Sequence, residues 1–277
     1  MAERVRQSHV VATDDTILPM LSVGKTQSAR MWVYVGDVAH PNNVFDFTLN
    51  RGRDGPKYFL RDYRQVLLAD AYGGYNGVVI GNQMTRAGCW AHARRRFIDA
   101  EKVAPEIARE AVDFIGALFR VERQAKDFSV KERLALRQAQ SAPVLAKLRQ
   151  KLLEWKEQLL PKHPMAEAVN YALSQWAELN VFCSDGAVPI DNNISDREMK
   201  RVVLNREKFF ICWQRTRRAN GGDPGQLNQH LPAARGGSAV ISHAAADEPT
   251  GGEGERVVRL AARPVEDPSS RSYGKPQ

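Results

Sequence analysis

The hydrophobic positions in the first third of the chain follow the period of β-strands. Apolar runs at 9–12, 31–35 and 44–48 are separated by turn residues, and the last of them alternates apolar with polar side chains. Successive strands with short connections are typical of an antiparallel meander. A fourth run, at 65–70, is apolar up to its final Asp, which is the pattern of a strand buried on both faces.

Two aspartates mark strand ends in this pattern. The first strand is expected to end at Asp14, and the buried fourth strand ends at Asp70. Pro56 predicts a short helix over 57–63, because proline suits the first helical turn. A last strand is expected at 86–90, after which the chain turns helical.

The middle of the chain, about 91–210, is predicted to be mostly helical. Helix-forming residues dominate 107–160, and Leu145, Leu148, Leu152 and Trp155 recur at helical spacing. Another helix is predicted at 165–180. The run Asp191-Asn192-Asn193 then supplies capping residues for a helix reaching about Arg206.

The last part, 211–277, has a different composition. It holds nine of the 20 glycines and six of the 14 prolines, and no helical or strand period persists along it. Such a segment buries too little apolar surface to offset its loss of conformational entropy. We therefore expect a disordered tail.

Composition and charge narrow the class of protein. The chain has 277 residues, a formal net charge of +8 and three widely spaced cysteines. These cysteines exclude a disulfide framework and a CxxC metal site. No apolar run approaches the roughly 18 residues of a membrane span, and the N-terminus lacks a signal-peptide pattern. We expect a cytoplasmic protein without a membrane partner, whose basic charge permits a polyanionic partner.

Three carboxylates are candidates for chemistry. Asp14 and Asp70 end central strands, and Asp196 lies in the first turn of the late helix. If they converge, their mutual repulsion makes them ligands for divalent cations, and two such ions promote phosphodiester chemistry. The alternative is that the strand-end aspartates are turn residues and Asp196 pairs with Lys200 at i,i+4.

Six sequence blocks carry a family resemblance, and the longer ones are specific. Together they resemble the transposase of the insertion-sequence sixty-six family, over about Val11 to Phe210. The blocks are Asp14-Asp15-Thr16, Arg30 to Tyr34, Arg53 to Pro56, Ala69 to Tyr75, Gly88 to Phe97, and Ile190 to Ile194 continuing to Asn205-Arg206.

The resemblance implies a ribonuclease-H-like α/β fold, a mixed sheet with flanking helices and a helical insertion. It also implies a DDE triad at Asp14, Asp70 and Asp196, acting through Mg²⁺ or Mn²⁺, with two ions in an active enzyme. The reaction would be DNA cleavage and strand transfer at the ends of an insertion sequence. The expected partners are the DNA at the ends of the element and the target DNA. Assembly with further copies of this chain is left as an alternative.

The third triad position departs from the family. The family block has Glu where this chain has Asp196, which shortens the side chain by one methylene, roughly 1.5 Å of reach. Glu198 lies about 200° further round the helix and should not substitute without a rotation of that helix.

The resemblance also points to basic DNA contacts. Arg94, Arg95 and Arg96 can contact phosphates, although three adjacent arginines are often simply solvated. Cys89 reads as a core residue because its neighbours are apolar. The residues expected to contact DNA are His92, Arg94, Arg95, Arg96, Lys200, Arg201 and Arg206.

Both ends depart from the family pattern. Only 13 residues precede Asp14, where the family has a long N-terminal region, so we expect a truncated copy. The resemblance stops at Phe210. Reading the codons from Ile211 one base later can give a Gly-Arg-rich sequence similar to the family's ending. We therefore hypothesise a frameshift near Ile211.

These observations predict four segments. Residues 1–97 form the first part of the catalytic core, 98–185 a helical insertion, 186–210 a core helix, and 211–277 an out-of-frame tail. The chain is expected to be a weakly active or inactive transposase. The alternatives are a DNA-binding remnant that interferes with intact transposase, another ribonuclease-H-like nuclease, and a product that never folds stably.

Overall fold

A computed structural model describes residues 1–22, 25–48, 50–52, 54–204, 240–241 and 259–261. Its core is a mixed sheet of five strands in the order β5-β4-β1-β2-β3. The strands are β1 (Val10–Ser22), β2 (Lys25–Val35), β3 (Asn43–Thr48), β4 (Val66–Leu68) and β5 (Thr85–Ala87). The chain is therefore a mixed α/β protein, as the strand and helix patterns predict.

The directions of the strands agree with the expected meander. β1, β2 and β3 are antiparallel neighbours, and β4 lies parallel to β1 on its other side, followed by β5. Two short strands, β7 (Arg259–Ala261) and β6 (Val240–Ile241), add to the edge beyond β3. The rest of the tail predicted to be disordered lies outside the described residues.

The first strand is longer than the sequence pattern indicates. The prediction that Asp14 ends it is wrong, because β1 continues to Ser22. The reason is tertiary: β2 pairs with β1 from Ala12, opposite Val35, to its end at Ser22, opposite Lys25. Asp14 therefore lies inside a paired strand, whose backbone fixes the direction of its side chain.

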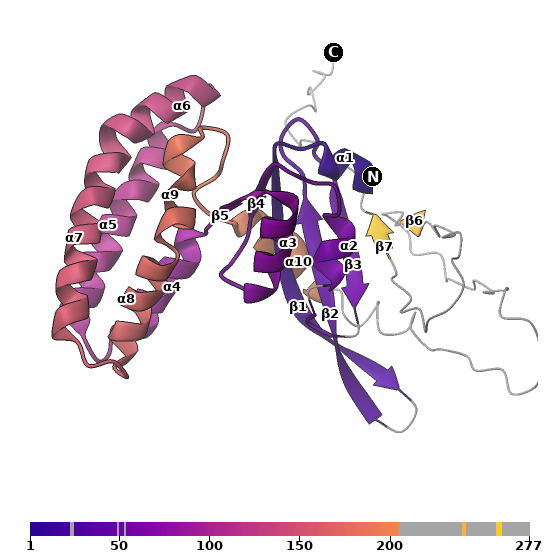
Figure 1. Cartoon of the computed structure of the whole chain (residues 1–277), viewed down its shortest axis with the longest axis horizontal. Coiled ribbons are helices and arrows are strands. Elements are labelled where there is room, and N and C mark those ends of the chain that lie inside the picture. The colour runs from indigo at the N-terminus through magenta and orange to yellow at the C-terminus, as the bar shows by residue number, and fades with distance from the viewer. Residues whose placement is uncertain (23–24, 49, 53, 205–239, 242–258, 262–277) are drawn as a thin grey trace, which may run out of the picture.

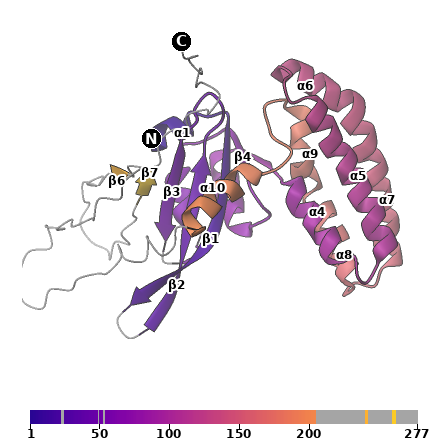
Figure 2. The same ribbon diagram turned by 180° about the vertical axis from the view of Figure 1, so that it is seen from behind.

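Different helices cover the two faces of the sheet (Figures 1 and 2). One face carries α1 (Ala2–Arg6), α2 (Asp54–Phe59) and α3 (Asn76–Asn82), and Tyr34 stacks on Phe59 with ring centroids 3.8 Å apart. The opposite face carries α10 (Asn193–Leu204), where Met199 joins a core that includes Val33. The predicted helix at 57–63 in fact begins at Asp54 and ends at Phe59.

The remaining helices form a bundle beside the β5 edge (Figure 1). They are α4 (Trp90–Asp99), α5 (Pro105–Gln124), α6 (Val130–Leu136), α7 (Ala142–Gln158), α8 (Pro164–Ser174) and α9 (Trp176–Ser184), with a π-helical turn at Arg137–Ser141. The helix predicted at 165–180 is two helices. Its break at Gln175 brings Trp176 edge-on to Trp90, with ring centroids 6.0 Å apart.

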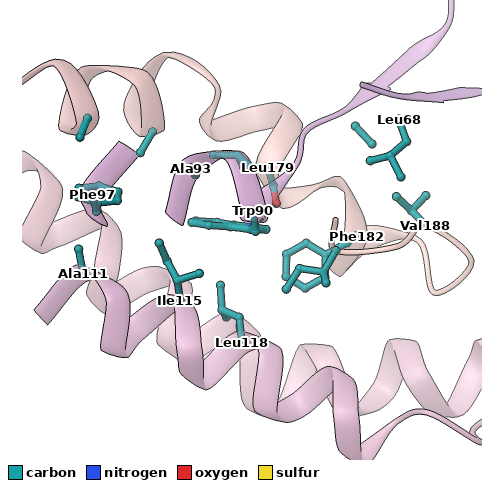
Figure 3. Packing of buried hydrophobic residues seen from close by; sticks show 14 of the residues in the cluster. Leu68, Trp90, Ala93, Phe97, Ala111, Ile115, Leu118, Leu179, Phe182 and Val188 are labelled. Atoms are coloured by element: carbon teal, nitrogen blue, oxygen red, sulfur yellow. Dashed lines mark hydrogen bonds between the residues drawn. The ribbon is translucent and has the colours of Figure 1, made fainter. Parts of the chain in front are cut away.

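Trp90 joins the bundle to the sheet (Figure 3). Its indole Nε1 donates to the carbonyl of Leu179 at 2.7 Å, and its backbone N–H donates to the carbonyl of Ile190 at 3.1 Å. Gly88 permits this approach, because a Cβ there would lie 3.1 Å from the backbone nitrogen of Leu179. These contacts return the chain to the sheet just before α10. In the described part of the chain, no helix has the length and apolarity needed to cross a membrane.

Candidate functional site

The register of β1 and β4 brings the first two predicted carboxylates together. The two parallel strands align Ala12 with Leu68. Asp14 and Asp70 each lie two residues beyond this last pair, Asp14 inside β1 and Asp70 just after the end of β4. The alternation of side chains along β1 directs the carboxylate of Asp14 to the face that α10 covers, the face to which Val10 and Ala12 also point.

A buried asparagine holds α10 against β1. The side-chain Nδ2 of Asn192 donates to the carbonyl of Thr13 at 2.9 Å, and Ser195 donates to its Oδ1 at 2.9 Å. The backbone N–H of Asn192 donates to the sulfur of Cys89 at 3.2 Å. Because Asn192 is wholly buried, these bonds fix the first turn of α10 beside Asp14.

This anchoring places Asp196 against Asp14. The pKa of Asp14 is raised to about 7 by burial, with further contributions from the charge and hydrogen bond of Asp196 and from the charge of Asp70. The N–H of Asp15, 2.8 Å from the Asp14 carboxylate, opposes that rise. The structure thus brings Asp14 and Asp196 into contact and leaves Asp70 within electrostatic range.

The three carboxylates suit a hard cation by their chemistry, since oxygen ligands of this type bind Mg²⁺. Their spacing is not that of a ready ligand set. Among the described residues, no group of three or more His, Cys, Asp or Glu side chains is close enough to hold a metal ion. The pair Asp14 and Asp196 is therefore the central geometric feature of this site, with Asp70 beside it.

Asp70 is held from two sides. Its carboxylate accepts the backbone N–H of Tyr72 at 3.0 Å, and its own carbonyl accepts a hydrogen bond from the guanidinium of Arg86. That guanidinium also donates to Asn76 at 2.7 Å and is largely buried. Arg86 is a positioning residue that the sequence did not single out, because its partners lie on other elements.

The sequence also allowed purely structural roles for the acidic residues at α10, namely capping of the helix and an ion pair between Asp196 and Lys200. Among the residues that it describes, the structure shows the first and not the second. Asp191 caps the start of α10. Its carboxylate accepts the backbone N–H of Asn193 at 3.1 Å and the side-chain amide of Asn193 at 2.7 Å. Among the described ion pairs none joins Asp196 to Lys200, and the α10 pair is Glu198 with Arg201 at 3.0 Å. Glu198 is therefore already engaged and does not replace Asp196.

A second acidic residue, next in sequence to Asp14, lies on the opposite face of the sheet. Asp15 is 1% exposed in its side chain and receives Arg30 at 2.8 Å and Arg51 at 2.9 Å. The guanidinium of Arg51 also lies over the ring of Tyr72, 4.1 Å from its centroid. Sequence reasoning missed this cluster, because pairs 15 and 36 residues apart leave no periodic signal.

The predicted DNA-binding residues separate into groups. His92 and Arg96 line a pocket with Asp70, whereas Arg94 and Arg95 are exposed residues outside its lining. Lys200 and Arg201 are exposed on α10, and Arg206 lies outside the described residues. Cys89 is a core residue as predicted, and burial raises the pKa of its thiol to about 11.

Comparison with known proteins supports the family resemblance. Residues 1–220 match the family model described as Transposase IS66 family. Three proteins of Sinorhizobium fredii, each described only as uncharacterized, are similar: y4jD is 32% identical over 75% of this chain, y4hP 30% over 74%, and y4qI 30% over 76%. This chain covers 42–43% of the length of these relatives. Because the family match extends over most of the chain, this protein belongs to the IS66 family of transposases.

Proposed function

We propose that the site of Asp14, Asp70 and Asp196 is a DDE centre for DNA strand cleavage and strand transfer at insertion-sequence ends. The observation that carries this proposal is the contact between Asp14 and Asp196 beside Asp70. Buried carboxylates repel one another unless they share a proton or a cation, so such a cluster is rarely only structural. DNA is the substrate that fits a transposase.

The topology supports a ribonuclease-H-like core. Three antiparallel strands, β1 to β3, are followed by β4 and β5 parallel to β1, and α10 covers the face on which the acidic residues meet. In this assignment the predicted insertion, residues 98–185, contains α5 to α9, and most of α4 stays with the first part of the core. The proposed core thus consists of two stretches of chain joined by the contacts of Trp90.

The proposed cofactor is Mg²⁺ or Mn²⁺, with two ions in an active centre. Asp14 and Asp196 would hold them together with Asp70. When bound, the ions would supply charge neutralisation at the attacking and leaving oxygens of the phosphodiester. Asp14 must be ionised to serve as a ligand, and its pKa of about 7 means that this occurs in the neutral range.

This copy is proposed to be weakly active or inactive. Asp196 is one methylene shorter than the Glu of the family block, which removes roughly 1.5 Å of reach toward a shared ion. The same observation favours a second candidate, a DNA-binding remnant without catalysis. In that case the basic surface of α4 and α10 would still bind DNA and interfere with intact transposase.

The test uses the purified chain, Mn²⁺ and a duplex carrying the ends of its own element, found in the DNA that flanks the gene. We expect little cleavage by the natural sequence and a rise of about tenfold or more in Asp196→Glu. Asp14→Asn in the Asp196→Glu background should abolish that activity. Cleavage that survives Asp14→Asn would contradict the DDE assignment, and DNA binding without cleavage in Asp196→Glu would favour the remnant.

Apart from β6 and β7, the residues that the frameshift prediction concerns lie outside the described ones, and the family match ends at residue 220. Reading the encoding DNA decides it. Codons that give a transposase ending one base out of frame after Phe210 would support the frameshift. Codons without that reading would make the tail a genuine extension.

A further inference from the structure

A pocket of about 320 Å³ opens beside Asp70 and has a composition suited to an anion. It is bordered by the turn after β3, the loop after β4, α4 and α8. Its charged and aromatic lining residues are Arg51, Asp70, Tyr72, His92, Arg96 and Tyr171. The volume is many times what one water molecule needs. It can therefore take a group much larger than a water molecule, such as a phosphate.

Aromatic rings hold both cations of the pocket in place. The guanidinium of Arg51 lies 4.1 Å from the ring centroid of Tyr72, and that of Arg96 lies 4.1 Å from the ring centroid of Tyr171. A guanidinium stacked on a ring is oriented before a ligand arrives, so less side-chain entropy is lost on binding.

Donors remain available on these cations. Arg51 uses its Nε and Nη2 for Asp15, at 3.2 and 2.9 Å, which leaves its other N–H groups. The guanidinium of Arg96 makes no hydrogen bond or ion pair with another described residue. The Nδ1 of His92, which also lines the pocket, is buried and has no hydrogen-bond partner among the described residues. The pocket thus offers two guanidinium groups against the single carboxylate of Asp70.

We propose that this pocket binds the backbone phosphate next to the scissile one in the DNA strand that is cut. The proposal rests on the proposed function, because Asp70 belongs both to the carboxylate site and to the wall of the pocket. A strand whose scissile phosphate lies at Asp14 and Asp70 carries a neighbouring phosphate, and paired guanidinium groups are well suited to binding it. Arg51 and Arg96 would then fix the register of the strand.

An exposed arginine of α7 provides a matched control. Arg96→Gln and Arg149→Gln remove the same charge from an exposed helical position, but only Arg96 lines the pocket. Binding of a fluorescein-labelled 15-nucleotide single strand to the full chain is measured by anisotropy in EDTA, over a series of salt concentrations. Working without metal separates this binding from catalysis.

We expect Arg96→Gln to weaken binding about tenfold and to reduce the salt slope by about 0.7. Arg149→Gln should change the dissociation constant less than twofold. Inorganic phosphate at fixed ionic strength should compete with the strand on the natural chain, and less on Arg96→Gln. Thermal denaturation checks that both variants remain folded, which their exposed positions favour.

The outcomes separate the two proposals. Equal losses in the two variants would overturn the pocket as a phosphate site and leave the DDE proposal intact. A natural chain that does not bind the strand at all would overturn the pocket as well. Normal Arg96-dependent binding with no cleavage in Asp196→Glu would instead contradict the proposed function, while the pocket would stand as a DNA-binding site.

Discussion

Asp14 and Asp15 are neighbours in sequence and opposites in environment. Asp15 is buried against two arginines, so its charge is compensated on one face of the sheet. Asp14 faces Asp196 and Asp70 on the other face, and its pKa is raised to about 7. The comparison teaches that burial alone does not mark a functional carboxylate. A functional carboxylate is marked by the lack of a neighbouring positive charge, because only a carboxylate without such a partner is stabilised by binding a cation.

The largest effect should come from the compensated residue. Asp15→Asn leaves Arg30 and Arg51 without their carboxylate, and breaking a buried ion pair of this kind costs about 3 kcal/mol of unfolding free energy. Urea denaturation measures the loss. Asp62→Asn is the control, since Asp62 is 86% exposed in its side chain and should cost less than about 0.5 kcal/mol. Similar stabilities of the two variants would refute the structural role of Asp15.

The anchor of α10 should come next. Asn192→Ala removes the donor to the Thr13 carbonyl and the acceptor for Ser195, which we expect to cost about 2 kcal/mol. It should also bring the pKa of Asp14 back toward its ordinary value, because Asp196 is released. Asn193→Ala, at the exposed neighbouring position, is the control. The account is wrong here if both substitutions leave denaturation midpoints unchanged.

The pH dependence of stability should then single out Asp14. Its folded pKa of about 7 exceeds the model-compound value of 3.8, so its contribution is present below about pH 4 and is lost as the pH rises through 7. The whole shift corresponds to about 4 kcal/mol, and sharing with neighbouring carboxylates reduces the expected loss to about 2 kcal/mol. Asp14→Asn should therefore be the more stable protein at about pH 8 and gain little at about pH 4. Parallel pH profiles of the two proteins would contradict the raised pKa.

The smallest effect should be stabilisation by Mg²⁺. At about pH 8 and 10 mM Mg²⁺, millimolar affinity for the folded state adds about 1 kcal/mol. Differential scanning calorimetry should show this gain for the natural chain and not for Asp14→Asn, with NaCl matching the ionic strength. An equal gain in both proteins would indicate unspecific binding.

The sequence predicted the parts of the fold that have a local signal. The strand that leads to Asp70 and the capped helix carrying Asp196 are where the patterns place them. The extension of β1 beyond Asp14 and the break at Gln175 were not predictable, because both depend on partners elsewhere in the chain. Pairing and packing across the fold decided these boundaries.

The candidate site shows the same limit. The resemblance supplied Asp14, Asp70 and Asp196, while the residues that position them came only from the structure. Asn192 reads as a capping residue in the sequence, yet it is the buried link between α10 and β1. Arg51 reads as an ordinary turn residue, because nothing local indicates its bonds to Asp15.

The most direct test of the carboxylate site is a titration of the full chain with Mn²⁺, followed by electron paramagnetic resonance, at about pH 8. The account predicts saturable binding by the natural chain, retained in Asp62→Asn and lost or weakened at least tenfold in Asp14→Asn and Asp196→Asn. Equal affinity and stoichiometry in the natural chain and in Asp14→Asn would contradict it.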